Sequence, residues 1–160
     1  MIGAFPPTDV AVRDGRVYCV QPISPIVQVM DAGGKTLGGI VVAPPFYRAP
    51  VDRPLSMNQK EAFEDLAGFT SNNAFYPLRD GPGFVSVYSS FDLELGGFRY
   101  WLFRCTLDAG WEAHDCAMTE STRKPILVTP GGEVFLEEEG EANDPPVVGI
   151  YRLGVERAAR

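Results

Sequence analysis

The sequence predicts an all-β fold built from antiparallel four-stranded meanders. Two observations support this prediction. Glycine and proline account for 17 and 14 of the 160 residues, which is roughly a fifth of the chain against a usual share of about 12%. Between them lie short runs rich in Val, Ile, Tyr and Phe. Many turns between short strands favour an all-β architecture, as four-stranded meanders or, alternatively, as a β-sandwich or irregular barrel.

The first group of predicted strands occupies residues 8–43. Asp14-Gly15 is expected to form a tight hairpin turn, because both residue types tolerate left-handed backbone conformations. The segment Asp31–Gly34 is expected to turn the chain again. The strands predicted around these turns are 10–12, 16–20, 26–30 and 36–42.

A proline-rich and helical insertion is predicted at residues 44–68. Four prolines fall between positions 44 and 54, and proline cannot donate a hydrogen bond to a sheet. Ser56 is a suitable helix N-cap, Gln59 completes a capping box, and Gly68 is a suitable end. One short amphipathic helix is therefore expected at the edge of the β structure.

Two further groups of strands follow. A turn is expected at Asp108-Ala109-Gly110 and another at Pro130–Gly132, since both are rich in turn-forming residues. The strands predicted around them are 83–88, 98–105, 111–118, 125–128, 133–136 and 147–153.

These groups of strands form an internal repeat. Asp14–Tyr18 aligns with Gly131–Phe135 and, more loosely, with Gly81–Val85. Asp31-Ala32-Gly33 aligns with Asp108-Ala109-Gly110. The chain is therefore predicted to be a single domain, residues 1–160, with similar units at about 8–43, 81–118 and 124–153.

The segment Pro25–Met30 aligns with Pro146–Tyr151, which extends the repeat to a third strand. A four-stranded meander of about 40 residues is the blade of a β-propeller. The run Asp14–Tyr18, a loop, and then Ile26–Lys35 resembles the repeats of NHL-type six-bladed propellers. The resemblance implies blade-like units, of which this chain holds about three.

A closed propeller needs at least four blades. Three units would leave open sheet edges, so we expect a homo-oligomer, a dimer in which two copies complete a ring. In this arrangement each N-terminal strand would close the last blade of the other copy.

The net charge of −7 argues against a nucleic-acid partner, because an acidic surface repels phosphate. No stretch approaches the roughly 18 apolar residues of a membrane span, so no membrane partner is expected. The first residues lack the basic and apolar regions of a signal peptide. The chain as written is therefore predicted to be cytoplasmic, or periplasmic or secreted if a leader was removed.

The three cysteines, Cys19, Cys105 and Cys116, do not have the spacing of a metal site. Three buried free thiols are the favoured interpretation, because cysteine is commonly buried as a small hydrophobe. A bridge between Cys105 and Cys116 across a hairpin is the alternative.

His114 is the only histidine, and Asp115 and Cys116 follow it. On a strand only His114 and Cys116 would share a face, and two ligands do not make a zinc site. No catalytic residue, metal site or cofactor is therefore predicted.

Aromatic residues are the stronger binding candidates. Phe98 and Tyr100 should share one strand face, and Trp101 and Phe103 the other. Core packing explains such residues, but an exposed platform for a sugar or a protein is the alternative. The candidate binding residues are Trp101, Trp111 and His114.

Carboxylates offer a weaker signal. Glu137–Glu139, with Glu141 and Asp144, could bind calcium, although such a run more often solvates a loop. Asp92 and Glu94 lack a second pair of oxygens for a glycosidase or calcium site.

The absence of a catalytic motif favours a non-catalytic binding or scaffold module of β-propeller type that recognises a protein or a small ligand. A calcium-dependent propeller-type hydrolase or lactonase is one alternative. A small inhibitor or immunity-type protein that acts through its acidic surface is another.

Overall fold

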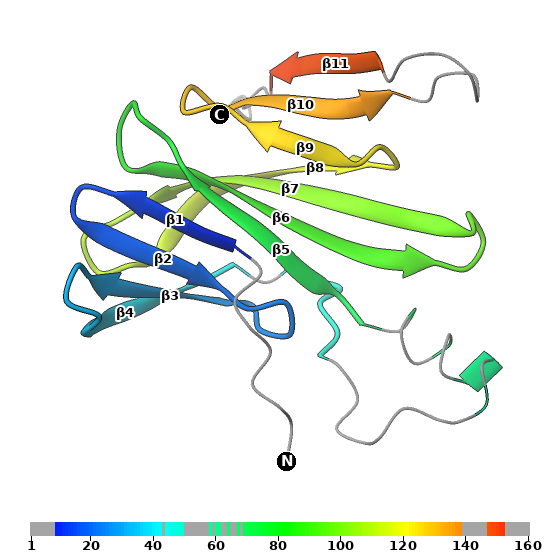
Figure 1. The fold of residues 1–160 in the computed structure, drawn as a ribbon, viewed down its shortest axis with the longest axis horizontal. Helices are drawn as coiled ribbons and strands as arrows, with labels where there is room; N and C mark the ends of the chain where they lie inside the picture. Colours follow the sequence, from blue (N-terminus) through cyan, green and yellow to red (C-terminus); the bar gives the residue numbers. More distant parts are fainter. Residues whose placement is uncertain are drawn as a thin grey trace.

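The computed structural model describes residues 9–42, 44–49, 58, 60–61, 64, 67, 69–138 and 147–152. Within these residues the chain forms three antiparallel sheets, in which consecutive strands are neighbours (Figure 1). The predicted all-β class, with antiparallel meanders, is confirmed. We name the sheets A, B and C in chain order.

Sheet A contains β1 (Asp9–Arg13), β2 (Arg16–Val20), β3 (Ile26–Asp31) and β4 (Thr36–Val41), in the order β1-β2-β3-β4. The predicted two-residue turn joins β1 to β2. Asp14 and Gly15 have φ values of 50° and 72°, the left-handed conformation expected of them.

Sheet B contains β5 (Ser71–Pro77), β6 (Gly83–Asp92), β7 (Gly97–Leu107) and β8 (Ala113–Ser121). The predicted second unit, 81–118, lacks β5. Tertiary contacts hold this asparagine-containing strand in place. The Asn72 amide group donates to the Ser24 carbonyl at 3.2 Å, and the Asn73 amide group donates to Ser89 Oγ at 2.7 Å. Because asparagine has a low β-propensity, the sequence pattern does not predict this strand.

Sheet C contains β9 (Pro125–Val128), β10 (Glu133–Glu138) and β11 (Val147–Arg152), in the order β11-β10-β9. Its strands correspond to the first three strands of sheets A and B. Sheet C therefore has three strands among the described residues, where the other two sheets have four.

Sheet B lies between the other two sheets, which cover both faces of β5, β6 and β7, while β8 is largely exposed (Figure 1). Its face toward sheet A is aromatic. Tyr18 of sheet A stacks on Phe75 with ring centroids 5.1 Å apart, and Phe75 stacks on Phe84 at 4.7 Å. Burying such a side chain contributes about 1.5–3 kcal/mol.

The face of sheet B toward sheet C is aliphatic. Val85, Val87 and Leu102 are buried there against Val128 and Val134 of sheet C. Because alternate residues of a strand point to opposite faces, β6 and β7 supply both cores at once.

Sheets A and B diverge like a wedge. Their backbones approach most closely where β1 and β2 meet β5. Toward β4 and β7 the space is filled by the segment that follows β4. Phe46 packs on Trp101 with ring centroids 4.2 Å apart, and Tyr47 meets Tyr88 edge-on. Burial raises the pKa of Tyr88 well above its usual value, so its hydroxyl remains a donor, and it donates to the Val42 carbonyl.

The described residues of the predicted helix, Lys60, Glu61, Glu64 and Ala67, are helical. The Ala67 carbonyl accepts a hydrogen bond from Ser90 Oγ at 3.3 Å, which attaches this segment to β6. The expected N-cap, capping-box and terminal residues, Ser56, Gln59 and Gly68, lie outside the described residues. In the part of the chain that the structure describes, no helix is long and apolar enough to cross a membrane.

The interpretation of three buried free thiols is wrong. Cys105 and Cys116 form a disulfide between β7 and β8, and Cys116 is exposed. The register of this strand pair shifts beside Cys105, which brings the two cysteines opposite one another. Cys19 is a free thiol, and it is only partly buried.

We expect that removing this disulfide lowers the free energy of unfolding by about 3 kcal/mol, because the unfolded chain loses a closed loop. The measurement compares urea denaturation of the wild type with that of a Cys105→Ala/Cys116→Ala double variant. Cys19→Ala is the control, and it should retain the wild type's sensitivity to a reducing agent. Equal denaturation midpoints with and without reductant would contradict this expectation.

Candidate functional site

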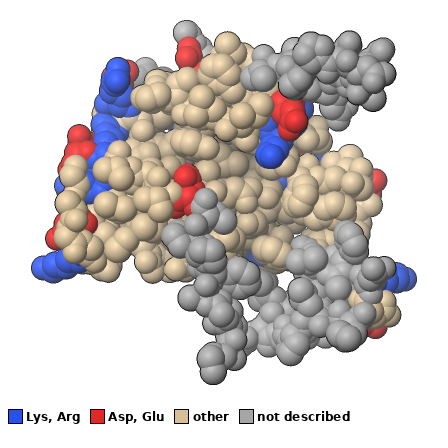
Figure 2. Space-filling view, in the orientation of Figure 1, with Lys and Arg blue, Asp and Glu red and all other residues tan. Residues whose placement is uncertain are grey.

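A pocket of about 480 Å³ opens between sheets A and B at the end where their hairpin turns lie. Its floor is aromatic and consists of Tyr18, Phe75 and Phe84, all buried. Its rim comes from the β1–β2, β5–β6 and β7–β8 turns. In Figure 2 most charged side chains of the visible face gather at this end, on the left, and much of the remaining surface is uncharged.

The β7–β8 turn forms one wall of the pocket, and it repeats the β3–β4 turn bond for bond. Asp31 Oδ1 accepts the backbone N–H groups of Gly33 and Lys35, each at 2.9 Å. Asp108 Oδ1 likewise accepts the N–H groups of Gly110 and Glu112, each at 2.8 Å. The alignment of the two Asp-Ala-Gly segments in the sequence therefore reflects a common turn.

One position differs between these turns. The residue with a positive φ is Gly34 in the β3–β4 turn, at 84°, and Trp111 in the β7–β8 turn, at 68°. A bulky residue is strained in this conformation, and such strain persists where the surroundings hold it. The sequence predicted Trp111 at the start of a strand, but it belongs to the turn, and β8 begins at Ala113.

Contacts with sheet A hold Trp111 against the pocket. A Cβ atom at Gly38 would lie 2.5 Å from Trp111 Cδ1, so only glycine lets the indole ring approach β4 this closely. On the pocket side, the guanidinium carbon of Arg16 lies 4.7 Å from the centre of the Trp111 ring. An arginine over an indole face is a favourable cation–π arrangement.

The rim is tied together by hydrogen bonds between turns. Arg13 Nη2 donates to the Arg79 carbonyl at 2.9 Å, and the Arg79 N–H donates to the Pro130 carbonyl at 2.7 Å. Arg13 also pairs with Asp14 at 3.1 Å. Arg16, by contrast, makes no ion pair with any residue in the described ranges. The pocket therefore has one cation available to a ligand.

On the same β7–β8 hairpin, three donor atoms lie within 4.8 Å of one another; they belong to Asp108, Glu112 and His114. His114 Nε2 lies 3.2 Å from Asp108 Oδ2. The backbone N–H of Glu112 and then His114 lower the pKa of Asp108 by hydrogen bonding to its charged form. All three side chains are exposed. One imidazole and two carboxylates could hold a divalent cation of the zinc type.

The predicted pairing of His114 with Cys116 on one strand face does not occur. Asp115 has a φ of 49°, and the register of β7 and β8 shifts beside it, so the alternation of faces is interrupted. His114 instead lies beside Asp108.

Of the three candidate binding residues, the structure brings Trp111 and His114 together on the β7–β8 hairpin. Trp101 lies elsewhere. It is 8% exposed and packs in the core between sheets A and B, as does Phe103. Trp101 and Phe103 share that face, while Phe98 and Tyr100 lie beside one another on the other face, as predicted. Core packing, and not an exposed platform, accounts for Trp101.

Sequence reasoning missed Arg16 and the pocket floor. The Asp31–Asp108 alignment could have identified Trp111 as a departure from a glycine in a repeated turn. No sequence signal places Arg16 beside Trp111, because the contact joins different sheets.

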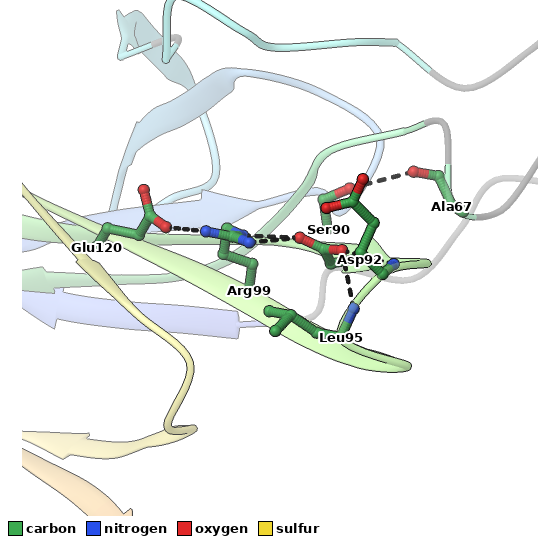
Figure 3. Close-up of polar contacts among 7 residues, drawn as sticks. Ala67, Ser90, Asp92, Leu95, Arg99 and Glu120 are labelled. Atoms are coloured by element: carbon green, nitrogen blue, oxygen red, sulfur yellow. Dashed lines mark hydrogen bonds and ion pairs between the residues drawn. The ribbon is translucent and has the colours of Figure 1, made fainter.

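Asp92, considered above for a glycosidase or calcium site, has a structural role (Figure 3). Asp92 Oδ2 accepts hydrogen bonds from Arg99 Nη2 and Nε at 2.6 and 2.9 Å, and Arg99 also pairs with Glu120. Asp92 Oδ1 accepts the N–H groups of Glu94 and Leu95. The cluster fastens the end of the β6–β7 hairpin to β8, and it uses both Asp92 oxygens.

Most of the acidic run considered for calcium, Glu139, Glu141 and Asp144, lies outside the described residues. Glu137 is exposed on β10. A scan of protein-family models and a search of curated proteins each found no match to this chain.

We expect Gly38→Ala to displace the Trp111 ring, because the added methyl group would occupy its place. The change should increase acrylamide quenching of tryptophan fluorescence, since Trp101 stays buried. Gly97→Ala is the matched control, because a Cβ atom there meets nothing within 4 Å. Equal quenching in both variants would contradict the contact.

We expect Asp92→Asn to lower the melting temperature by a few degrees at neutral pH. Arg99 and then the Leu95 N–H hold the pKa of Asp92 below its usual value. A lowered pKa in the folded state stabilises the fold above the unfolded-state pKa, and this contribution is lost as the pH falls through the folded-state pKa. The melting temperatures of wild type and variant should therefore converge as the pH falls below about 5 and through the lowered folded-state pKa of Asp92.

Asp115→Asn serves as the control for this experiment, because its side chain is exposed and asparagine tolerates the same backbone conformation. A difference between wild type and Asp92→Asn that stays constant with pH would contradict the role of the carboxylate charge.

Proposed function

We propose that this protein is a non-catalytic binding module whose pocket between sheets A and B takes a small ligand with an aromatic ring and a negative charge. The observation that carries the proposal is Arg16 stacked on Trp111 at the mouth of an aromatic-floored pocket. Small-molecule sites are usually concave and combine apolar walls with a few convergent polar groups. This pocket combines an aromatic floor with charged side chains at its rim.

The chemistry of the walls selects the ligand class. Tyr18, Phe75 and Phe84 supply a floor of aromatic carbon for an apolar group, with Phe75 stacked between the other two rings. Arg16 offers a planar, permanently charged guanidinium group that can bind a carboxylate through two hydrogen bonds. An aromatic carboxylate satisfies both features. The strained backbone of Trp111 supports this proposal, because such strain gathers at ligand-binding sites.

The β-propeller character of the module is part of the proposal. Three meanders with one repeated turn, stacked face to face, support it. The calcium-dependent hydrolase is less favoured, because the one histidine–carboxylate group among the described residues comes from a single hairpin. A hydrolase of that type would need carboxylates from several sheets.

Aromatic carboxylates such as benzoate and indole-3-acetate test the proposed pocket. We expect them to shift the Trp111 indole N–H resonance in a two-dimensional NMR spectrum, and the shift should reach a plateau as the ligand concentration rises. Arg16→Ala should weaken binding by roughly tenfold to a hundredfold, because it removes the charge-assisted contact. Arg48→Ala, an exposed arginine near the opposite end of β5, is the matched control.

No shift at millimolar probe, or equal affinity in the Arg16→Ala and Arg48→Ala variants, would overturn the proposal. Thermal melting of the protein with and without added calcium or zinc tests the alternative function, a calcium-dependent hydrolase. Stabilisation by several degrees at submillimolar calcium would favour the hydrolase.

A further inference from the structure

Both outer faces of the three-sheet stack carry exposed apolar side chains. On sheet A, the outward positions carry a rear patch of Val10, Val12, Val17, Ile26 and Val41, in which Val12 is 71% exposed. The positions between these on the same face are also uncharged, and include Cys19, Gln28 and Met30. Contiguous apolar surface of this kind on a sheet marks an interaction site.

On sheet C, the outward positions carry a forward patch of Leu127, Phe135 and Ile150, and Glu133 and Glu137 flank Phe135 at the next outward positions of β10. The strand register places these three side by side across the sheet, with Leu127 and Ile150 each opposite Phe135. Ile150 is 62% exposed and Leu127 is 49% exposed. Phe135 is half-buried at the centre of the row.

The internal repeat identifies which kind of face each patch is. Aligned on their turns, Tyr18, Val85 and Phe135 occupy one equivalent position in the three sheets. Tyr18 is buried against sheet B, and Val85 is buried against sheet C. Each of these two residues therefore lies on the face that packs against the following sheet. Phe135 lies on the corresponding face of sheet C, the forward face, which no described sheet covers.

The neighbouring position gives the complementary result. Val17, Phe84 and Val134 are equivalent in the same alignment. Phe84 is buried against sheet A, and Val134 is buried against sheet B, so each faces the preceding sheet. Val17 lies on the corresponding rear face of sheet A. Each sheet-to-sheet contact inside the chain thus joins a forward face to a rear face. The rear face of sheet A and the forward face of sheet C are covered by no described sheet.

We propose that a second copy of this chain covers these faces. The forward patch of one copy packs on the rear patch of the other, in the way that sheet A packs on sheet B and sheet B on sheet C. Two copies make this contact twice, so the six sheets close into a ring with no patch left over. A head-to-tail contact that closes in this way gives a finite particle instead of a fibre.

This arrangement differs from the strand exchange expected from the sequence. In the single chain β1 pairs with β2 of its own sheet, and the arrangement proposed here keeps that pairing. Whole faces, and not a single exchanged strand, form the contact. The proposal does not depend on the ligand of the pocket between sheets A and B.

Sedimentation equilibrium of the full chain, from low micromolar to tenth-millimolar concentration, tests the proposal. We expect a particle of two 17.5-kDa chains. Val12→Glu and Ile150→Glu, in opposite patches, should each raise the dissociation constant by about a hundredfold, because each would bury an unpaired charge. Both positions are exposed in the single chain, and circular dichroism should show that both variants remain folded.

Leu93→Glu is the matched control, since Leu93 is 60% exposed in the β6–β7 turn, outside both patches. It should leave the dimer unchanged. The Cys19 thiol gives an independent measure, because its reaction with a thiol reagent should be slower in the wild type than in Val12→Glu. A monomer at tenth-millimolar concentration, an open series of larger species, or a dimer that survives both patch variants would overturn the proposal.

Discussion

The burial of sheet B on both faces is the constraint on which the rest of the structure depends. The strands β6 and β7 must each supply apolar side chains to both faces. The side chains toward sheet A are mainly aromatic, and those toward sheet C are aliphatic. Polar residues within these strands must then find partners inside the core. Ser86, fully buried, donates to the Ala74 carbonyl at 3.4 Å. A sheet buried on both faces tolerates few alternative registers, because a shift by one residue would exchange its two faces.

The wedge between sheets A and B follows from this packing and creates the pocket. Where β1 and β2 meet β5 the backbones are close, and elsewhere large side chains fill the gap. At the end where the hairpin turns lie, no large side chain of the described residues fills the space between the two sheets. The aromatic residues there form the floor of a pocket that opens to solvent. Trp111 and Arg16 stand at this opening because two different hairpins end there. The pocket is therefore a property of how the sheets meet, and neither sheet contains it alone.

The sequence predicted the fold class, the repeated turns and ten of the eleven strands, because glycine, aspartate and proline mark turns by local chemistry. It did not reveal β5, whose asparagines are held by Ser24 and Ser89 from other parts of the chain. Of the candidate site, Trp111 and His114 could be selected as residue types. Their neighbours could not, since Arg16, Phe75 and Gly38 are brought to them by packing between sheets, which no local pattern encodes.

In the five-residue turn that recurs in this chain, one residue makes the hydrogen bond that holds the turn, and a different residue can vary. In it, Asp31, Asp108 or Thr129 accepts a backbone N–H from the residue four positions on, at 2.9, 2.8 and 3.1 Å. The fourth residue adopts the left-handed conformation and contributes no side-chain bond to the turn. Evolution could therefore replace this residue without dismantling the hairpin, at the cost of backbone strain alone. The same loop offers protein engineers a cassette in which a single position can carry new side-chain chemistry on an unchanged frame.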